Sequence, residues 1–379
     1  MTLPMTNYSH NILGSSAIPS YNGQHFAEEQ DVVIVSIKCV SPHTATRMPE
    51  TPNNDKSYRL SIFGFPGNPL GEQNLGLLDQ RLAIEWVRDN IAAFGGDPTR
   101  ITLFGQSAGG VSIDDYTYAW PCHPIVHGVI AQSGTGTGIS NRTLQQANVY
   151  WFNASRAAGC GDSNKNHKDV HECMLGLPAQ TIAKSLVETV NSGVAMPYSP
   201  TMDDKVVFRH PSSRTAAAIP MLIGHTDFEY GLFELFTDEE APHDFWQTQG
   251  DEMFGCPAGR RAELSAKAGN PTWRYRYFGN FENLRLSNHP DSGAYHESEV
   301  KLLFNTVDES HGNSTKDEVA LGAYLRAAWA AFAKDPVNGL TKIGWPRYKS
   351  NDTTLIRLGY RNSVGPNLAR ADTYDKSCW

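Results

Sequence analysis

The chain has 379 residues, enough for one large domain or for two to three domains of ordinary size. Its 40 acidic and 32 basic residues give a net charge of −8, so no basic surplus is available to neutralise a nucleic-acid backbone. No apolar run approaches the roughly 20 residues that a membrane-spanning helix needs, and the low charged fraction of 19% favours a secreted protein.

The predicted elements begin with a β-branched run at residues 31–37 (DVVIVSI), which is typical of a buried strand. Residues 39–57 carry three prolines and almost nothing apolar, so this segment is predicted to be a loop or a disordered insert. Residues 75–94 form the clearest helix, which Gly95 and Gly96 end. Its apolar side chains follow two lines at spacings of three and four: Leu75, Leu78 and Leu82, and then Ile84, Val87, Ile91 and Phe94.

Strands and helices alternate along the rest of the chain. Further strands are predicted at residues 100–104, 128–132, 220–224 and 272–278, and further helices at 145–158 and 318–333. This alternation predicts an α/β fold with a mostly parallel central sheet and helices on both faces. Because no second linker interrupts the pattern, residues 1–379 are expected to form a single domain.

A G-x-S-x-G motif at residues 105–109 lies between a predicted strand and a predicted helix. In this context the serine, Ser107, sits on a tight turn that admits only small residues two positions away, here Gly105 and Gly109. The helix that follows starts with Ala108, whose N–H points to where an oxyanion develops. The motif therefore predicts a nucleophilic serine.

A nucleophilic serine needs a base, and the base needs a carboxylate to orient it. In this geometry the partners follow in the order acid and then histidine, each just beyond a later strand. Asp227 and Glu229 both follow the strand at 220–224, and the pattern does not choose between them. His296 follows the strand at 272–278, with His225 and His289 as alternatives.

The stretch at residues 74–110 (NLGLLDQRLAIEWVRDNIAAFGGDPTRITLFGQSAGG) resembles the type-B carboxylesterases, the cholinesterase-like branch of the α/β-hydrolase fold. The similarity extends over nearly everything from Tyr58 to Trp379 and is greatest to secreted fungal members. It implies a catalytic triad of Ser107, Glu229 (rather than Asp227) and His296. It also implies that Glu299 is a buried partner behind the site.

The chain has six cysteines, none of them in a CxxC pair, so a structural zinc site is not expected. The resemblance implies two disulfides, Cys160 with Cys173 and Cys256 with Cys378, and it has no counterpart for Cys39 and Cys122. Five Asn-x-Ser/Thr sequons favour a secretory route and a glycoprotein, although the first residues lack the pattern of a signal peptide. These sequons are at Asn7, Asn141, Asn153, Asn313 and Asn351.

Two features depart from the family. An HGGGF-like segment, whose glycine N–H groups supply further oxyanion donors in the family, has no counterpart here. We expect a lost first exon, and with it a fold incomplete at its N-terminal edge. The insert at residues 39–57 splits a run that is continuous in the family, so we expect a retained intron. With Ala108 N–H as the one identifiable donor, little esterase activity is expected unless Gly14 N–H substitutes.

The leading prediction is a serine hydrolase that cleaves small carboxylic esters through an acyl-enzyme intermediate, with no metal or organic cofactor. The alternative is a catalytically silent, cholinesterase-like binding or adhesion protein. No nucleic-acid partner and no membrane span are expected. Tyr116, Tyr118 and Trp120 lie near Ser107 in sequence, and their aromatic rings fit a substrate gorge or the core.

Overall fold

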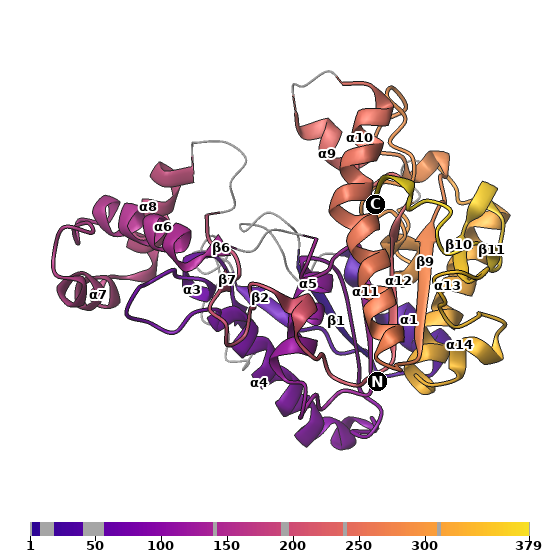
Figure 1. Ribbon diagram of the computed structural model, residues 1–379, viewed down its shortest axis with the longest axis horizontal. Helices are drawn as coiled ribbons and strands as arrows, with labels where there is room; N and C mark the ends of the chain where they lie inside the picture. Colours follow the sequence, from indigo (N-terminus) through magenta and orange to yellow (C-terminus); the bar gives the residue numbers. More distant parts are fainter. Residues whose placement is uncertain are drawn as a thin grey trace.

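The computed structural model describes residues 2–7, 19–40, 57–138, 142–190, 197–237, 241–308 and 312–378. Within these ranges a seven-stranded sheet has the order β1-β4-β5-β8-β9-β10-β11 (Figure 1). Its strands are β1 (Thr2–Asn7), β4 (Thr102–Ser107), β5 (Gly128–Gln132), β8 (Met221–Thr226), β9 (Thr272–Tyr277), β10 (Leu355–Leu358) and β11 (Asn367–Ala369). The pairs from β1 to β10 are parallel and β11 is antiparallel to β10, so the carboxyl ends of the parallel strands meet at one end of the sheet.

The helices alternate with these strands, as the sequence predicts. Those longer than one turn are α1 (Gln24–Gln30), α4 (Leu75–Asn90), α5 (Ala108–Ala119), α6 (Leu144–Ala157), α7 (His167–Gly176), α8 (Ala179–Val190), α10 (His243–Gly250), α11 (Cys256–Lys267) and α13 (Lys316–Lys334). Short helical segments that bear on the site are η1 (Pro19–Tyr21), α9 (Tyr230–Phe233), η5 (Asp251–Gly255) and α12 (Val300–Phe304). Helices α6, α7 and α8 project to one side of the sheet, at the left of Figure 1.

Both faces of the sheet are buried. Ile130 of β5 belongs to one buried cluster, whereas its neighbours Val129 and Ala131 belong to the other. Alternate side chains of a strand point to opposite faces, so these two clusters are the two layers between sheet and helices. Helix α13 completes the first layer, and α4, α5 and α11 complete the second. The residues of this second layer include Tyr116, which is therefore part of the core.

No helix in the described ranges is long and apolar enough to cross a membrane.

The predicted helix at residues 75–94 is confirmed as α4, which continues into a 3-10 turn at Ile91–Phe94 and ends at Gly95 with a φ of 78°. In the second predicted line Ile84, Val87 and Ile91 are buried, but its last member, Phe94, is 64% exposed. The other line is wrong, because Leu82 is 64% exposed and Leu77 is buried instead. A difference of one residue along a helix turns a side chain by about 100°, so spacing alone does not fix the buried face.

The predicted strand at residues 31–37 is wrong. Strand β2 covers Lys38–Val40 only, and residues 31–37 form no ladder among the described residues apart from an isolated bridge. Val32 and Ile34 pack against the first buried layer, whereas Val33 and Val35 pack against the second. The β-branched run therefore reflects burial on both sides of an extended segment. Among the described residues, burial accounts for that composition without a ladder to a neighbouring strand.

The predicted insert at residues 39–57 starts and ends in paired strands. Strand β2 pairs in parallel with β3 (Ser57–Arg59), so residues 39, 40 and 57 are strand, whereas residues 41–56 lie outside the described residues. At the edge of the main sheet that was expected to be open, β1 pairs with β4 over six residues. Gly14 lies outside the described residues, and the single-domain organisation stays a prediction.

Candidate active site

Ser107 ends β4 and stands directly before α5, with a φ of 58° and a ψ of −122°. Such a backbone conformation is costly for any residue other than glycine, by roughly 1–3 kcal/mol, and it persists only where the surroundings enforce it. A Cβ on Gly134 would lie 2.1 Å from the Ser107 carbonyl oxygen, so only glycine at 134 lets the next loop pack against the turn. As the first residue of α5, Ala108 presents an N–H with no partner inside the helix.

Glu229 and His296 meet at the same end of the sheet. Glu229 lies three residues beyond β8 at the start of α9, and His296 lies between β9 and α12. His296 Nδ1 is 2.5 Å from Glu229 Oε2, and the His296 backbone N–H donates to the Glu229 carbonyl oxygen at 3.2 Å. The other carboxylate oxygen of Glu229 accepts from the Thr226 backbone N–H at 2.8 Å. Glu229 and His296 are thus joined through both side chain and backbone.

Both groups are nearly removed from solvent, with 1% of Glu229 and 2% of His296 exposed. Burial disfavours the charged imidazolium, but the charge and hydrogen bond of Glu229 outweigh it and raise the pKa of His296 above its ordinary value. The charges of Glu297 and Glu299 act in the same direction. The site therefore favours a ring that accepts a proton and holds it.

Two aromatic rings enclose the imidazole. The centroid of the Phe233 ring lies 5.1 Å from that of His296, and the centroid of the Phe254 ring lies 4.9 Å from it. The two phenyl rings lie nearly parallel to each other, with an interplanar angle of 8°. Phe233 comes from α9 and Phe254 from η5, and no local sequence pattern predicts that they converge on His296.

The second ring nitrogen of His296 is bonded to a residue that the sequence did not single out. Gln106 Nε2 lies 3.1 Å from His296 Nε2. Since Nδ1 faces the Glu229 carboxylate and carries hydrogen, Nε2 is the acceptor and the amide is the donor. Within the described ranges no hydrogen bond joins Ser107 Oγ to His296, so the amide of Gln106, the residue before Ser107, holds the nitrogen that would receive a serine proton.

The alternatives to Glu229 and His296 have other surroundings. Asp227 forms an ion pair of 2.7 Å with Arg276, which also donates to its carbonyl oxygen. His225 is fully buried, burial lowers its pKa well below the ordinary value, and neither ring nitrogen has a hydrogen-bond partner in the described part of the chain. His289 is exposed on a turn. In the described part of the chain, none of the three is hydrogen-bonded to the Ser107 turn.

Glu299 lies three residues beyond His296 and is only 1% exposed. Its Oε1 accepts from Gln132 Nε2 at 2.9 Å, and Gln132 in turn accepts from Trp329 Nε1. Its Oε2 has no partner among the described residues. Burial raises the pKa of Glu299 to about 7. Glu299 is therefore a buried carboxyl behind His296 and not a solvated surface glutamate.

The structure contains two disulfides with the pairing that the resemblance implies. Cys160 and Cys173 are joined with their Cα atoms 5.6 Å apart, and Cys256 and Cys378 with theirs 5.3 Å apart. The second bridge ties the end of the chain to the first residue of α11, which directly follows the segment that carries Phe254. Cys122 is an exposed free thiol, and the side chain of Cys39 lies outside the described residues.

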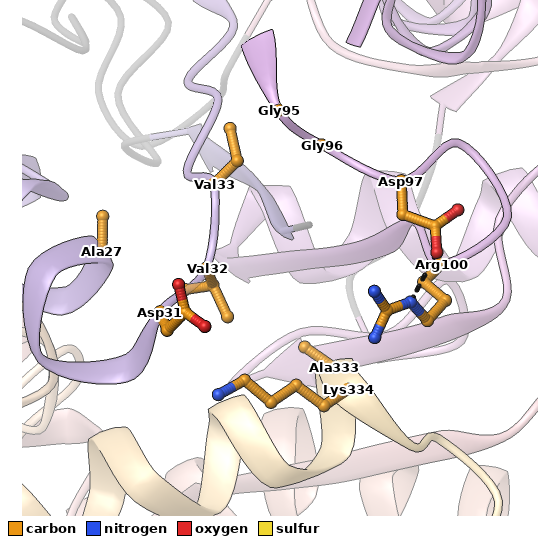
Figure 2. A pocket seen from close by; sticks show the side chains of 10 residues that line it. All are labelled: Ala27, Asp31, Val32, Val33, Gly95, Gly96, Asp97, Arg100, Ala333 and Lys334. Atoms are coloured by element: carbon orange, nitrogen blue, oxygen red, sulfur yellow. Dashed lines mark hydrogen bonds and ion pairs between the residues drawn. The ribbon is translucent and has the colours of Figure 1, made fainter. Parts of the chain in front are cut away.

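A cavity of about 450 Å³ lies away from this site (Figure 2). It is lined by Asp31, Asp97, Arg100 and Lys334, with the backbone of Gly95 and Gly96, among others. Arg100 lies just before the start of β4 and Ser107 at its end, so the cavity is roughly 20 Å from the serine along the strand. It includes none of the candidate triad residues. In the described ranges, no cluster of three or more His, Cys, Asp or Glu residues could hold a metal ion.

Comparison with known proteins gives a consistent result. A model of the carboxylesterase family matches residues 55–249 and 237–375. The chain is 39% identical over 339 residues to secreted lipase 5 of Gibberella zeae, an alignment covering 81% of this chain and 62% of the lipase. It is 35% identical over 302 residues to chlorogenic acid esterase of Aspergillus niger, covering 78% of this chain and 58% of the esterase.

A more distant relative is para-nitrobenzyl esterase of Bacillus subtilis, 26% identical over 387 residues, with 91% of this chain and 73% of the esterase covered. The chain thus spans about three fifths of the length of the two fungal relatives, 62% and 58%.

Proposed function

The chain belongs to the carboxylesterase family, and from this membership we propose that it is a serine hydrolase that cleaves carboxylic esters. In this proposal Ser107 is the nucleophile, His296 is the general base and acid, and Glu229 orients the imidazole and stabilises its charged form. The observation that supports it most is the 2.5 Å contact between Glu229 and His296, at the same end of the sheet as the strained turn at Ser107.

The reaction proceeds in two halves. Ser107 Oγ attacks the ester carbonyl carbon while its proton passes to His296 Nε2, and the carbonyl oxygen becomes an oxyanion that accepts from Ala108 N–H. Collapse of this intermediate breaks the bond to the alcohol oxygen, which takes the proton from His296. Water then loses a proton to the same nitrogen as it attacks the acyl-enzyme, and the carboxylic acid leaves with Ser107 restored. No external oxidant, metal or cofactor enters these steps.

The contact between Gln106 and His296 has to change before the first step of this reaction. His296 Nε2 has one lone pair in the ring plane, and the Gln106 amide occupies it at 3.1 Å. The amide must turn away before the Ser107 hydroxyl can donate to that nitrogen. Productive binding of an ester therefore includes a rearrangement of the Gln106 side chain.

The proposed substrate is a small-molecule ester, without further commitment to its acyl or alcohol part. The relatives carry the names of a lipase, a chlorogenic acid esterase and a para-nitrobenzyl esterase, and the bond common to these names is a carboxylic ester.

We also propose an extracellular location. Two disulfides are typical of proteins from oxidising compartments, and one relative is named a secreted lipase. The sequon residues Asn313 and Asn351 are exposed, so they are accessible for N-glycosylation. A mass decrease on treatment of the secreted protein with an N-glycosidase is the expected result.

A fluorophosphonate probe tests the catalytic proposal, because it labels an activated serine and not an ordinary one. We expect one label per chain, located on Ser107 by peptide mass spectrometry, and none on heat-denatured protein or on Ser107→Ala. Ser363→Ala, which removes an exposed serine hydroxyl elsewhere, serves as the matched control and should label normally. A folded protein that takes no label and hydrolyses no ester would instead be a catalytically silent binding protein.

A further inference from the structure

Glu297, the residue directly after His296, has a strained backbone. Its φ is 83°, in the left-handed region that favours glycine. For a long side chain this conformation costs on the order of 1–3 kcal/mol, so the surrounding contacts have to enforce it. Its carbonyl oxygen accepts from the Val300 N–H at 3.0 Å, which places Glu297 in the turn that links His296 to α12. A change at Glu297 therefore passes directly to the backbone that carries the imidazole.

A residue far away in the sequence holds this turn. Tyr21 Oη donates to Glu297 Oε1 at 2.8 Å, across a separation of 276 residues. Tyr21 itself is 4% exposed and lies in η1. Its ring meets that of Phe304, at the end of α12, edge to face at 6.1 Å. Thr306, just beyond α12, also donates to the Ser20 carbonyl oxygen at 3.0 Å, so η1 is fixed against the segment that follows His296.

On its other side His296 is fixed by different contacts. Glu229 binds both its ring and its backbone N–H, and both contacts act from the direction of β8. Glu297 and Tyr21 act from the carboxyl side of the histidine. When these contacts are lost, the strained residue is less restrained and the His296 ring can move with the turn as it relaxes.

We infer that Tyr21 is a positioning residue for the proposed reaction: its hydrogen bond to Glu297 holds the strained turn that sets the place of the His296 ring. This inference rests on the proposed function, since it assigns a role in the turnover of the same site. Tyr21 acts through Glu297, which is bonded covalently to His296.

Tyr21→Phe removes the hydroxyl and keeps the ring that packs on Phe304. We expect kcat for p-nitrophenyl acetate to fall about tenfold with KM unchanged, since a small displacement of a catalytic group has effects of this order and larger. Tyr374→Phe is the matched control, because it also removes one tyrosine hydroxyl with one hydrogen bond, from Arg357. The control should keep the wild-type kcat. A Tyr21→Phe enzyme within twofold of wild type would overturn the inference.

A double variant separates positioning from a general loss of stability. Glu297→Gly removes the acceptor and also the strain, since glycine adopts a positive φ readily. If Tyr21 acts through Glu297, adding Tyr21→Phe to Glu297→Gly changes kcat by less than twofold. If the two losses multiply instead, Tyr21 acts by another route and the inference is wrong.

The charge of Glu297 is separable from its bond to Tyr21. The carboxylates whose charges reach the buried ring are Glu229, Glu297 and Glu299, while Gln106, Phe233 and Phe254 are its uncharged neighbours. Glu297→Gln keeps an acceptor for Tyr21 and loses one negative charge. We expect the acid limb of kcat/KM to move to lower pH while kcat on the plateau stays within twofold. An unmoved plateau supports the positioning role of the bond, and a tenfold loss contradicts it.

A readout that needs no turnover keeps this inference distinct from the proposed function. In protein labelled with ¹⁵N-histidine, the His296 signals are assigned by their loss in His296→Asn. We expect Tyr21→Phe to shift these signals and to speed exchange of the Nδ1 proton with water, with no such change in Tyr374→Phe. If wild type hydrolyses no ester but these shifts appear, the proposed function fails and the positioning role stands. Unchanged signals in Tyr21→Phe overturn the positioning role.

Discussion

The acid and base of the candidate site are held by side-chain contacts, whereas the nucleophile is held by its backbone. Glu229 and His296 share two hydrogen bonds, and two phenyl rings enclose the imidazole. Ser107 has no hydrogen bond to His296 in the described ranges, and its place is set by a strained φ and by the close approach of Gly134. Substitutions at Glu229 or His296 should therefore act by changing the protonation of the imidazole. Substitutions around Ser107 should act by changing the shape of its turn.

The largest effect is expected at the nucleophile itself. Ser107→Ala removes one oxygen atom and leaves the turn intact, so the protein should fold normally. Loss of a triad serine lowers turnover by roughly four to six orders of magnitude. The activity that remains comes from substrate binding and oxyanion stabilisation. Ester hydrolysis measured beside the thermal midpoint checks this. Turnover within about tenfold of wild type would place the nucleophile elsewhere.

Removal of the Glu229 charge comes next. Glu229→Gln leaves an amide of the same shape against His296, and kcat should fall by about 10²- to 10⁴-fold. The sign of the pH effect is fixed, because Glu229 is the group that chiefly raises the pKa of His296. Without its charge the pKa falls, so the acid limb of the residual activity should move to lower pH. A limb that moves to higher pH would mean that another carboxylate is the partner of the base.

The same treatment of Asp227 sharpens the choice between the two acids. Asp227→Asn weakens an ion pair with Arg276 and leaves the bond between Glu229 and His296 in place. It should reduce stability more than kcat, and it should leave the acid limb of the pH profile unmoved.

A substitution at Gly134 tests whether the backbone holds Ser107 in place. A methyl group there would lie 2.1 Å from the Ser107 carbonyl oxygen, so Gly134→Ala must displace the turn. We expect a loss of about 1–3 kcal/mol in the free energy of unfolding and a fall in kcat of roughly a hundredfold, with the pH profile unchanged. Gly176→Ala is the control, since a methyl group there meets no atom within 4 Å. Equal effects of the two changes would contradict the account of the turn.

The sequence predicted the elements that carry the site better than the contacts that hold it. The turn at Ser107 was predictable because strand, motif and helix follow one another within a few residues. The local pattern did not choose between Asp227 and Glu229, because both follow β8; the family resemblance implied Glu229, and in the structure Asp227 pairs with Arg276 of the next strand, β9. Gln106, Phe233, Phe254 and Tyr21 reach His296 or its neighbour from four segments, and no local pattern encodes such long-range contacts.

The strand predicted at residues 31–37 failed for a related reason. An apolar, β-branched composition indicates burial. This segment is partly buried, with Val32 packed against the first buried layer and Val33 against the second. A strand also needs a neighbour that supplies hydrogen bonds, and the identity of that neighbour is not written in the segment itself. The short strands β10 and β11 were missed because a segment of four or three residues is too short to show a periodic pattern.

The smallest expected effect concerns Glu299, the third carboxyl near the imidazole, and it is a stability effect. Burial raises its pKa from an ordinary 4.5 to about 7, so the folded protein holds this proton more tightly than the unfolded chain does. The stability that this group contributes is fully present below pH 4.5 and is lost as the pH rises through 7, by an amount on the order of 3 kcal/mol. Glu299→Gln keeps an oxygen that can accept from Gln132 and has no proton to lose, so its stability curve should be flatter over that interval. Urea denaturation at pH 4.5, 5.5 and 7 measures the slope of stability against pH. Glu252→Gln, which removes an exposed carboxyl of η5, should give a curve parallel to wild type.

Because the charge of Glu299 also helps raise the pKa of His296, Glu299→Gln should move the acid limb of kcat/KM to lower pH, but by less than Glu229→Gln does. A Glu299→Gln protein with the wild-type slope would show that Glu299 is ionised across this interval, and His296 would then have three permanent charges near it, those of Glu229, Glu297 and Glu299, and not two.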